Sequence, residues 1–452
     1  MTRYLIIGNG AAGATAAQTL REQDPRGEIT IVSAEPHPMY SRPGLAYILI
    51  DEIPDKQVLA RTPEWYQANR LRLVYGTAVR LDTAEHRVHL ADGQALSYDR
   101  LLIATGARAV PLPYPGADLD GVVFLDTLDG TRDLLRRVKR AKRAVVLGGG
   151  ITALEMTEGF AHHGLETHYF LRRNLLWASV FNAAESKLLE EKMREHGVQL
   201  HFNTEAAEIV GDKHRRVAGV KLASGEIVAS DLVGAGIGVK AQLDLVKGTA
   251  IKTDKSILVD EYLTTSVPDV FAAGDCAQAW DPWTRKHSVE VLWPTAVAQG
   301  RVAAVNMAGG RSAYAKGTPF NACLLFGLHI TAIGQLGGNR DADEPEVVQH
   351  TSRGWSETWT TRPRAYASAW SQHGPNTTRL AFDGDRLVGA LVVGEQSLAD
   401  PLRFLIEKQI DVRPLRPHLD KGGPDMPWLV QQVYLRMRDL PAEQLPLASA
   451  AA

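Results

Sequence analysis

Short apolar runs alternate with helical patterns through about the first 300 residues of the chain. Strands are predicted at residues 4–7 and 28–33, with a helix at about 11–21 between them. The same order of strand, helix and strand recurs over residues 143–171. Because this alternation is typical of βαβ units around a mostly parallel sheet, we expect an α/β fold.

The pattern changes after the second unit. The chain returns through residues 260–275 to a short strand, and a helix is predicted at about 294–307. From about residue 320 the aromatic residues Trp355, Trp359, Tyr366 and Trp370 and an apolar strand at 387–393 predict a smaller C-terminal α+β domain. The Ala-, Pro- and Leu-rich tail, residues 441–452, is expected to be disordered.

The first strand ends in a glycine motif, Gly8-Asn9-Gly10-Ala11-Ala12-Gly13, that opens the first helix. Such glycines permit a tight turn and the close approach of a pyrophosphate to the free N–H groups of the helix. Glu35 follows the second strand, where a carboxylate accepts hydrogen bonds from ribose hydroxyls. Residues Gly8, Gly10, Ala12, Gly13 and Glu35 are therefore predicted to bind a dinucleotide.

A second motif, Gly148-Gly149-Gly150-Ile151-Thr152-Ala153, has alanine at its third glycine position, a permitted variant. It predicts a second dinucleotide site containing Gly148, Gly150 and Ile151, so the chain should hold two Rossmann-like domains. Its following strand ends at Arg172-Arg173 with no acid for a ribose diol. Arg172 can pair with a 2′-phosphate, which favours NADPH slightly over NADH, and both coenzymes stay open.

Composition narrows the class of protein. An apolar content of 45% and a net charge of −2 are those of an ordinary globular protein without a nucleic-acid partner. No apolar run reaches the roughly 20 residues that span a bilayer, and the first strand leaves no room for a leader, so a cytoplasmic protein is expected. The two cysteines, Cys276 and Cys323, are too few for an iron–sulfur cluster, and no histidine spacing predicts a metal site.

Residues 101–107 (LLIATGA) and 265–275 (TSVPDVFAAGD) closely resemble the pyridine nucleotide-disulfide oxidoreductases, and the resemblance covers most of the chain. It implies that the first fold binds FAD and the second NAD(P). Asp275 would then bond the ribityl chain, and the helix near residue 294 would direct its N-terminus at the flavin pyrimidine ring. The resemblance adds these residues to the cofactor sites: Val79, Ala104, Thr105, Gly106, Gly274, Asp275 and Ala296.

The segment 40–47 (YSRPGLAY) resembles the ferredoxin and rubredoxin reductases and the flavin portion of nitrite reductases. Disulfide-reducing members carry redox cysteines here, whereas this chain has Pro43, which disfavours a disulfide substrate. The same resemblance places Arg42 on the FAD diphosphate. Ferredoxin reductases usually have a lysine near the flavin where this chain has Tyr47, so we expect no lysine-assisted orientation of the flavin.

Two groups of residues have open interpretations. Glu155 matches a family glutamate near the flavin and nicotinamide and is the candidate catalytic residue, but it also fits a first-turn acid favoured by the helix dipole. Trp280, Trp283 and Trp293 either pack in the core, shield the flavin or form a partner surface.

Together these observations predict an FAD-dependent NAD(P)H oxidoreductase that exchanges electrons with ferredoxin, rubredoxin or an iron–sulfur subunit of a larger complex, as a homo-oligomer or hetero-complex. The alternatives are an NAD(P)H oxidase or peroxidase and a flavin-bearing structural subunit without nicotinamide turnover. We predict three domains. A discontinuous FAD domain comprises residues 1–112 and 250–320, an NAD(P) domain comprises residues 113–249, and an interface domain comprises residues 321–440.

Overall fold

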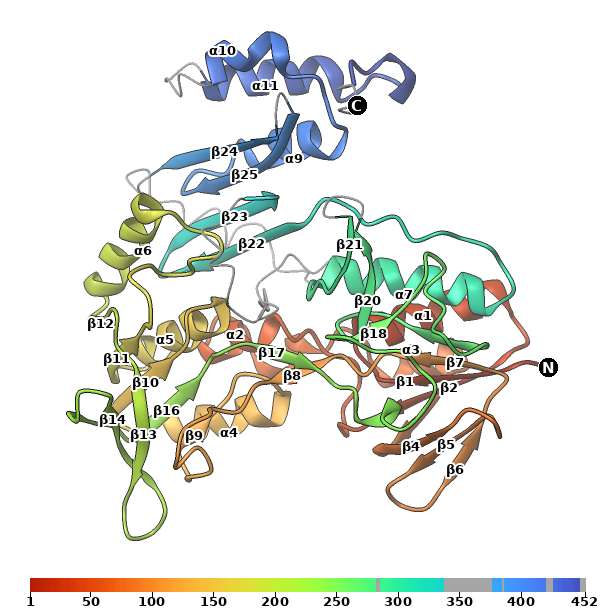
Figure 1. Cartoon of the computed structure of the whole chain (residues 1–452), viewed down its shortest axis with the longest axis horizontal. Helices are drawn as coiled ribbons and strands as arrows, with labels where there is room; N and C mark the ends of the chain where they lie inside the picture. Colours follow the sequence, from red (N-terminus) through yellow and green to blue (C-terminus); the bar gives the residue numbers. More distant parts are fainter. Residues whose placement is uncertain (282–284, 337–375, 384–385, 420–425, 448–452) are drawn as a thin grey trace.

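Figure 1 shows a computed structural model of the chain in which two α/β units lie side by side and a smaller C-terminal unit, coloured blue, lies at the top of the view. The structure describes residues 1–281, 285–336, 376–383, 386–419 and 426–447. The expected fold class is confirmed, because each of the two larger units is built around a five-stranded parallel sheet.

The first sheet has the strand order β19-β7-β1-β2-β3. Its strands are β1 (Arg3–Ile7), β2 (Glu28–Ser33), β3 (Arg72–Tyr75), β7 (Arg100–Ile103) and β19 (Val270–Ala272). The helices α1 (Ala11–Gln23) and α7 (Trp293–Met307) pack closely on each other, since a Cβ on Gly300 would lie 2.3 Å from the Ala12 carbonyl oxygen. The remaining elements are α2 (Gly44–Leu49), η1 (Asp55–Val58), α3 (Pro63–Ala68), β4 (Ala78–Asp82), β5 (Arg87–Leu90), β6 (Ala95–Ser97), η2 (Asp244–Val246), β18 (Ile257–Leu258), β20 (Ala277–Asp281) and β21 (Lys286–Ser288).

The second sheet repeats this plan with the order β12-β11-β10-β16-β9. Its strands are β9 (Val122–Val123), β10 (Arg143–Leu147), β11 (Glu166–Phe170), β12 (Gln199–His201) and β16 (Leu232–Ala235). The helices of this unit are α4 (Leu128–Val138), α5 (Ile151–His162) and α6 (Ala183–Glu195), and a three-stranded antiparallel sheet is formed by β13 (Ala206–Gly211), β14 (Val217–Leu222) and β15 (Ile227–Ala229).

The chain passes between the two units twice. The two passages pair as the short antiparallel strands β8 (Ala107–Ala109) and β17 (Val239–Ala241). All strands of the first sheet fall within the predicted ranges 1–112 and 250–320, and all strands of the second fall within 113–249. The exact domain boundaries stay a prediction.

The C-terminal unit contains a four-stranded antiparallel sheet of order β22-β23-β25-β24, as expected for an α+β domain. Its elements are β22 (Phe320–Leu325), β23 (Leu328–Gly334), β24 (Thr377–Asp383), β25 (Arg386–Val393), α9 (Ala399–Glu407), η3 (Arg413–Leu415), α10 (Arg416–Leu419), α11 (Met426–Met437) and η4 (Ala442–Gln444). The aromatic residues used to predict this domain lie outside the described residues: Trp355, Trp359, Tyr366 and Trp370.

Disorder was expected for residues 441–452, but the described part of this tail, residues 441–447, has backbone contacts. After η4, Leu447 forms a β-bridge with Ile410, and the Asp411 N–H donates to the Pro446 carbonyl at 2.7 Å. Backbone pairing with the preceding unit therefore orders residues 441–447, while 448–452 lie outside the described residues.

Candidate functional site

The turn between β1 and α1 has room for a ligand beside one glycine only. Gly8 has a φ of +119°, and a Cβ there would lie 2.0 Å from the Ala104 carbonyl oxygen. A Cβ on Gly13 would lie 2.0 Å from the Gly8 carbonyl oxygen, whereas one on Gly10 would meet nothing within 4 Å. Gly8 and Gly13 thus allow close backbone packing, and Gly10 leaves open space at the N-terminus of α1, where an anion is stabilised.

Two further strand ends meet this turn. After β7, the Thr105 hydroxyl donates to the Gln242 carbonyl and the Gln242 side chain donates back to the Thr105 carbonyl, both at 2.9 Å. After β19, the Gly274 N–H donates to the Gln299 side chain of α7 at 2.8 Å. The carboxyl ends of β1, β7 and β19 therefore converge at one edge, the usual ligand position in such sheets. Residues expected in the site that lie here are Gly8, Ala12, Ala104, Thr105, Gly106, Gly274, Asp275 and Ala296.

Glu35 and Arg42, which sequence reasoning assigned to ribose and diphosphate, bond each other. The Arg42 guanidinium lies 3.0 Å from Glu35 Oε1 and 2.9 Å from Asp126 Oδ1, and the Tyr40 hydroxyl donates to Glu35 Oε2 at 2.8 Å. Asp126 was not predicted. Its position just before α4 lets it hold Arg42 from the second unit, and a sequence motif could not have revealed this contact.

Asp275 follows Gly274 at the same edge of the sheet. Burial raises the pKa of this carboxyl to about 6, and the positive charge of Arg42 opposes part of that rise. A partly buried carboxyl beside an open turn is a strong acceptor for hydroxyl donors of a ligand.

The turn between β10 and α5 repeats the first arrangement. Gly148 has a φ of +142°, and a Cβ there would lie 2.1 Å from the Gly236 carbonyl oxygen, while Cβ atoms on Gly149 and Gly150 would meet nothing within 4 Å. Ala153 takes the third position because Gly236 faces it, and a Cβ on Gly236 would lie 2.7 Å from the Ala153 Cβ. Sequence reasoning missed Gly236, although its place at the end of β16 parallels that of Ala104 after β7.

A match to the model of the pyridine nucleotide-disulphide oxidoreductases extends over residues 2–300, which includes both glycine turns. The chain belongs to this family. It is therefore an oxidoreductase and a flavoprotein that uses FAD and NAD(P)H, as the resemblance implied.

The chain is similar to three reductases of known name or structure. Rhodocoxin reductase of Rhodococcus erythropolis is 34% identical over 69% of this chain and 73% of its own length. Rubredoxin-NAD(+) reductase of Ectopseudomonas oleovorans is 30% identical over 68% of this chain and 80% of its own length. The crystal structure of a ferredoxin reductase from Rhodopseudomonas palustris superposes with a TM-score of 0.77 at 25% identity, covering 91% of this chain and 94% of that one.

The family's redox-cysteine region carries no thiol in this chain. Pro43, which stands where the resemblance implies a redox cysteine in disulfide-reducing members, is the N-cap of α2. Cys276 and Cys323 are both buried and do not form a disulfide with each other, and burial raises the pKa of the Cys276 thiol. Neither sulfur is placed as the reactive thiolate of a disulfide reductase.

Glu155 is fully buried on α5, and α5 has no acidic residue in its first turn. The first-turn interpretation is therefore wrong, because Glu155 lies one turn further into the helix, where the dipole effect has fallen off. Ile151, the first residue of α5, is also buried. Arg172, two residues after β11, is exposed.

The structure lends less support to the expected role of Val79 and to the expected core packing of the tryptophans. Val79 lies on β4 with 52% of its surface exposed, so its role at the cofactor stays a prediction. The core interpretation of the tryptophans is wrong for Trp280, which is 48% exposed, and Trp283 lies outside the described residues.

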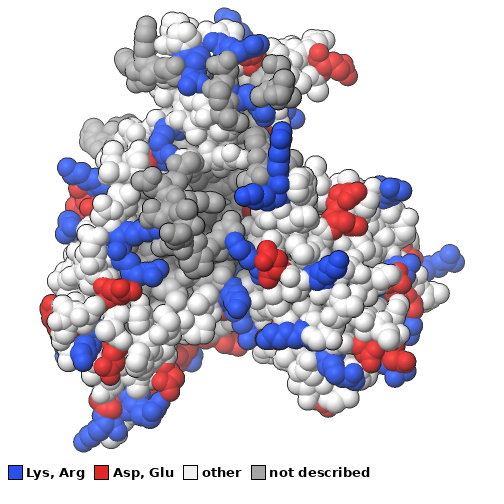
Figure 2. Space-filling view, viewed as in Figure 1, with Lys and Arg blue, Asp and Glu red and all other residues white. Residues whose placement is uncertain are grey.

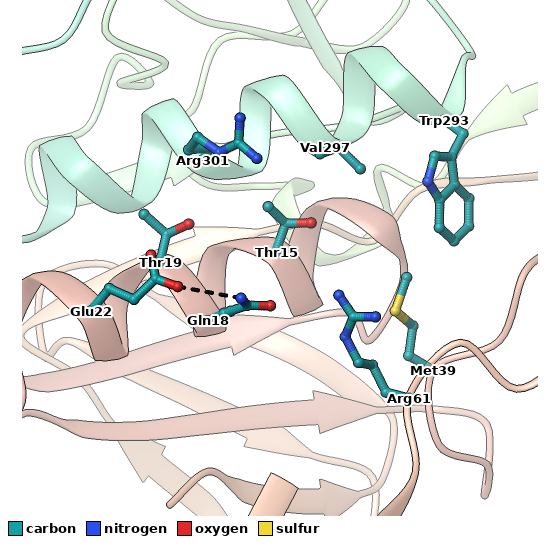
Figure 3. Close-up of a pocket in the computed structure, with 9 residues that line it drawn as sticks. All are labelled: Thr15, Gln18, Thr19, Glu22, Met39, Arg61, Trp293, Val297 and Arg301. Atoms are coloured by element: carbon teal, nitrogen blue, oxygen red, sulfur yellow. Dashed lines mark hydrogen bonds between the residues drawn. The ribbon is translucent and has the colours of Figure 1, made fainter. Parts of the chain in front are cut away.

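Trp293 begins α7 and lines a pocket of about 240 Å³ between α1 and α7. Figure 3 shows Arg301 of α7 and Arg61 of the loop after η1 on opposite sides of this pocket, with Met39 beside Trp293. The other lining residues are Thr15, Gln18, Thr19, Glu22 and Val297. The pocket therefore combines two basic groups and one acidic group with neutral polar and apolar groups next to the N-terminus of α7.

Among the described residues, no helix combines the length and apolar character of a membrane span. Within the same ranges, no cluster of three or more His, Cys, Asp or Glu side chains is arranged to hold a metal ion.

Proposed function

We propose that this protein is an NAD(P)H-dependent reductase of an iron–sulfur electron carrier such as a ferredoxin or rubredoxin. The observation that carries the proposal is Pro43 at the N-cap of α2. The resemblance of residues 40–47 implies a cysteine at this place in disulfide-reducing members of the family. Neither Cys276 nor Cys323 replaces that thiol, so electrons on the flavin would pass to the acceptor without a cysteine relay in this chain. The names of two relatives, rhodocoxin reductase and rubredoxin reductase, support a protein acceptor.

FAD is assigned to the first glycine turn. Gly10 leaves space for the diphosphate, Glu35 and Arg42 are placed to exchange their mutual ion pair for ribose and phosphate contacts, and Asp275 accepts ribityl hydroxyls. The N-terminus of α7, including Ala296, would face the pyrimidine ring and stabilise negative charge there. When bound, FAD accepts a hydride from the nicotinamide and returns electrons one at a time.

The nicotinamide dinucleotide is assigned to the second turn, with its diphosphate beside Gly149 and Gly150 and its ring near Glu155. Hydride transfer requires stacking of the two rings, so these residues contribute position and the exclusion of water. The exposed Arg172 supports a preference for a 2′-phosphate, and hence for NADPH.

The carrier is proposed to dock over the pocket of Arg61, Trp293 and Arg301, because this surface adjoins the N-terminus of α7. Arg61 and Arg301 line this pocket, and their positive charges favour an acidic partner. Figure 2 shows further Lys and Arg side chains on one face of the molecule, interspersed with Asp and Glu. The reaction is placed in the cytoplasm, an environment consistent with two cysteines that form no disulfide. Assembly as a homo-oligomer or a hetero-complex stays a prediction.

The test compares electron acceptors. Purified protein with NADPH or NADH should reduce a ferredoxin or rubredoxin at least about tenfold faster than it consumes oxygen. The substitution Arg301→Glu should raise the KM for the carrier about tenfold and leave flavin reduction by the nucleotide unchanged. Arg215→Glu, at an exposed residue of the β13–β14 connection, serves as the matched control. Oxygen consumption that exceeds carrier reduction would instead identify an oxidase.

A further inference from the structure

Asn321, the second residue of β22, has an unusual environment. Its side chain is 5% exposed, and among the described residues neither Oδ1 nor Nδ2 has a hydrogen-bond partner. A buried amide with both polar atoms unsatisfied is costly and rare in native proteins. This side chain therefore points to a ligand that supplies one donor and one acceptor.

The contacts of residues 316–326 show which elements lie near Asn321. The segment that contains it is fixed at one end by Lys316, whose ammonium binds Glu290 just before α7 at 3.4 Å. At the other end, the Phe326 N–H donates to Glu158 of α5 at 2.7 Å. Asn321 lies between these anchors in sequence, on a segment whose two ends contact the α7 side of the first unit and α5 of the second.

The strand pattern supports the same orientation. In β22, alternate residues are buried, and Asn321 shares the buried face with Cys323 and Leu325. The last two belong to a hydrophobic cluster with Leu45 of α2 and Leu154 of α5. The buried face of β22 that carries Asn321 is therefore shared with a cluster that includes α2 and α5, and α5 begins at the second glycine turn.

We propose that the side-chain amide of Asn321 recognises the carboxamide of the nicotinamide ring. The inference rests on the proposed function, since it requires a nicotinamide beside α5. The carboxamide presents one C=O acceptor and one NH₂ donor, which match Nδ2 and Oδ1 of an asparagine. Two such hydrogen bonds would fix the rotation of the ring about the bond to its ribose and so present the correct face for hydride transfer.

The test measures equilibrium binding to the oxidised, FAD-loaded protein by calorimetry. The probes are NAD⁺ or NADP⁺, whichever the wild type binds, and the matching ADP-ribose, which lacks the nicotinamide. Asn321→Leu should raise the Kd of the complete dinucleotide about tenfold, the effect of leaving a buried partner unpaired, and change the Kd of ADP-ribose by less than about twofold. Asn376→Leu, at an exposed asparagine just before β24, is the control and should change neither.

An analogue localises the contact. In 3-acetylpyridine adenine dinucleotide a methyl group replaces the carboxamide NH₂, so Asn321→Leu should weaken its binding less than that of NAD⁺. Asn321→Ser, which retains a polar group, provides a second variant if the leucine variant does not fold. An unchanged dinucleotide Kd, or a change in the flavin absorption spectrum instead, would overturn the proposal. If the wild type binds neither dinucleotide, the proposed function fails first, and the two failures are distinguishable.

Discussion

Asp275 provides a prediction in which stability and cofactor binding change in opposite directions. Its ordinary carboxyl pKa of 3.8 rises to about 6 in the folded protein because burial disfavours the charged form. The folded protein therefore binds this proton more tightly than the unfolded chain does. As the pH increases from about 4 to above 6, the unfolded chain loses this proton at a lower pH than the folded protein does. The free energy of unfolding of FAD-free protein therefore falls over this range.

The rise in pKa corresponds to about 3 kcal/mol, and water at the partly exposed carboxyl reduces this to about 2 kcal/mol. Asp275→Asn removes the charge and keeps the shape. The substitution should leave the free energy of unfolding of FAD-free protein unchanged near pH 4 and increase it by about 2 kcal/mol near pH 8. In the same variant, FAD affinity should fall at least about tenfold, because an amide is a weaker acceptor for ribityl hydroxyls.

Urea unfolding of FAD-free wild type and variant across this pH range provides the assay, with Asp118→Asn as a control at a side chain that is 76% exposed. The reasoning is refuted if Asp275→Asn destabilises the FAD-free protein near pH 8, or if the difference between the two proteins does not vary with pH.

Three other substitutions test separate parts of the account. Gly148→Ala would place a Cβ 2.1 Å from the Gly236 carbonyl oxygen, so nucleotide affinity should fall at least about tenfold while FAD stays bound, as measured by calorimetry and flavin absorbance. Arg172→Glu should shift the ratio of kcat/KM for NADPH over NADH toward NADH by about tenfold or more, and an unchanged ratio would argue against a 2′-phosphate contact. Lys316→Met would leave the buried Asp281 carboxylate without its 2.7 Å ion pair, and thermal unfolding should report a loss of about 3–5 kcal/mol.

The two glycine turns could be predicted from the sequence because their conformation depends on residues that are adjacent in the chain. A glycine that follows a strand and opens a helix has few other uses, so the turns at Gly8 and Gly148 follow from the pattern alone. The start of α7 was predicted to within one residue, since the helix begins at Trp293 and a start near Pro294 was expected.

The contacts between distant segments could not be predicted in this way. Asp126 holds Arg42 from another unit, and Gly236 accommodates Ala153 only because β16 lies beside β10. The amide of Asn321 looks ordinary in sequence, since its significance depends on burial without a partner. The alternation of buried residues in β22 could have indicated a polar residue on a buried face, but its missing partners are visible only in three dimensions.

The central claim is that electrons pass from a nicotinamide through the flavin of this chain to an external one-electron carrier. Anaerobic stopped-flow spectroscopy tests it most directly. The FAD-loaded protein is mixed with NADPH or NADH and then with oxidised ferredoxin or rubredoxin, while the oxidised-flavin absorbance is followed. We expect rapid bleaching by at least one nucleotide, followed by recovery of the flavin absorbance as the carrier is reduced. The absence of bleaching by both nucleotides, or bleaching that only oxygen reverses, would contradict it.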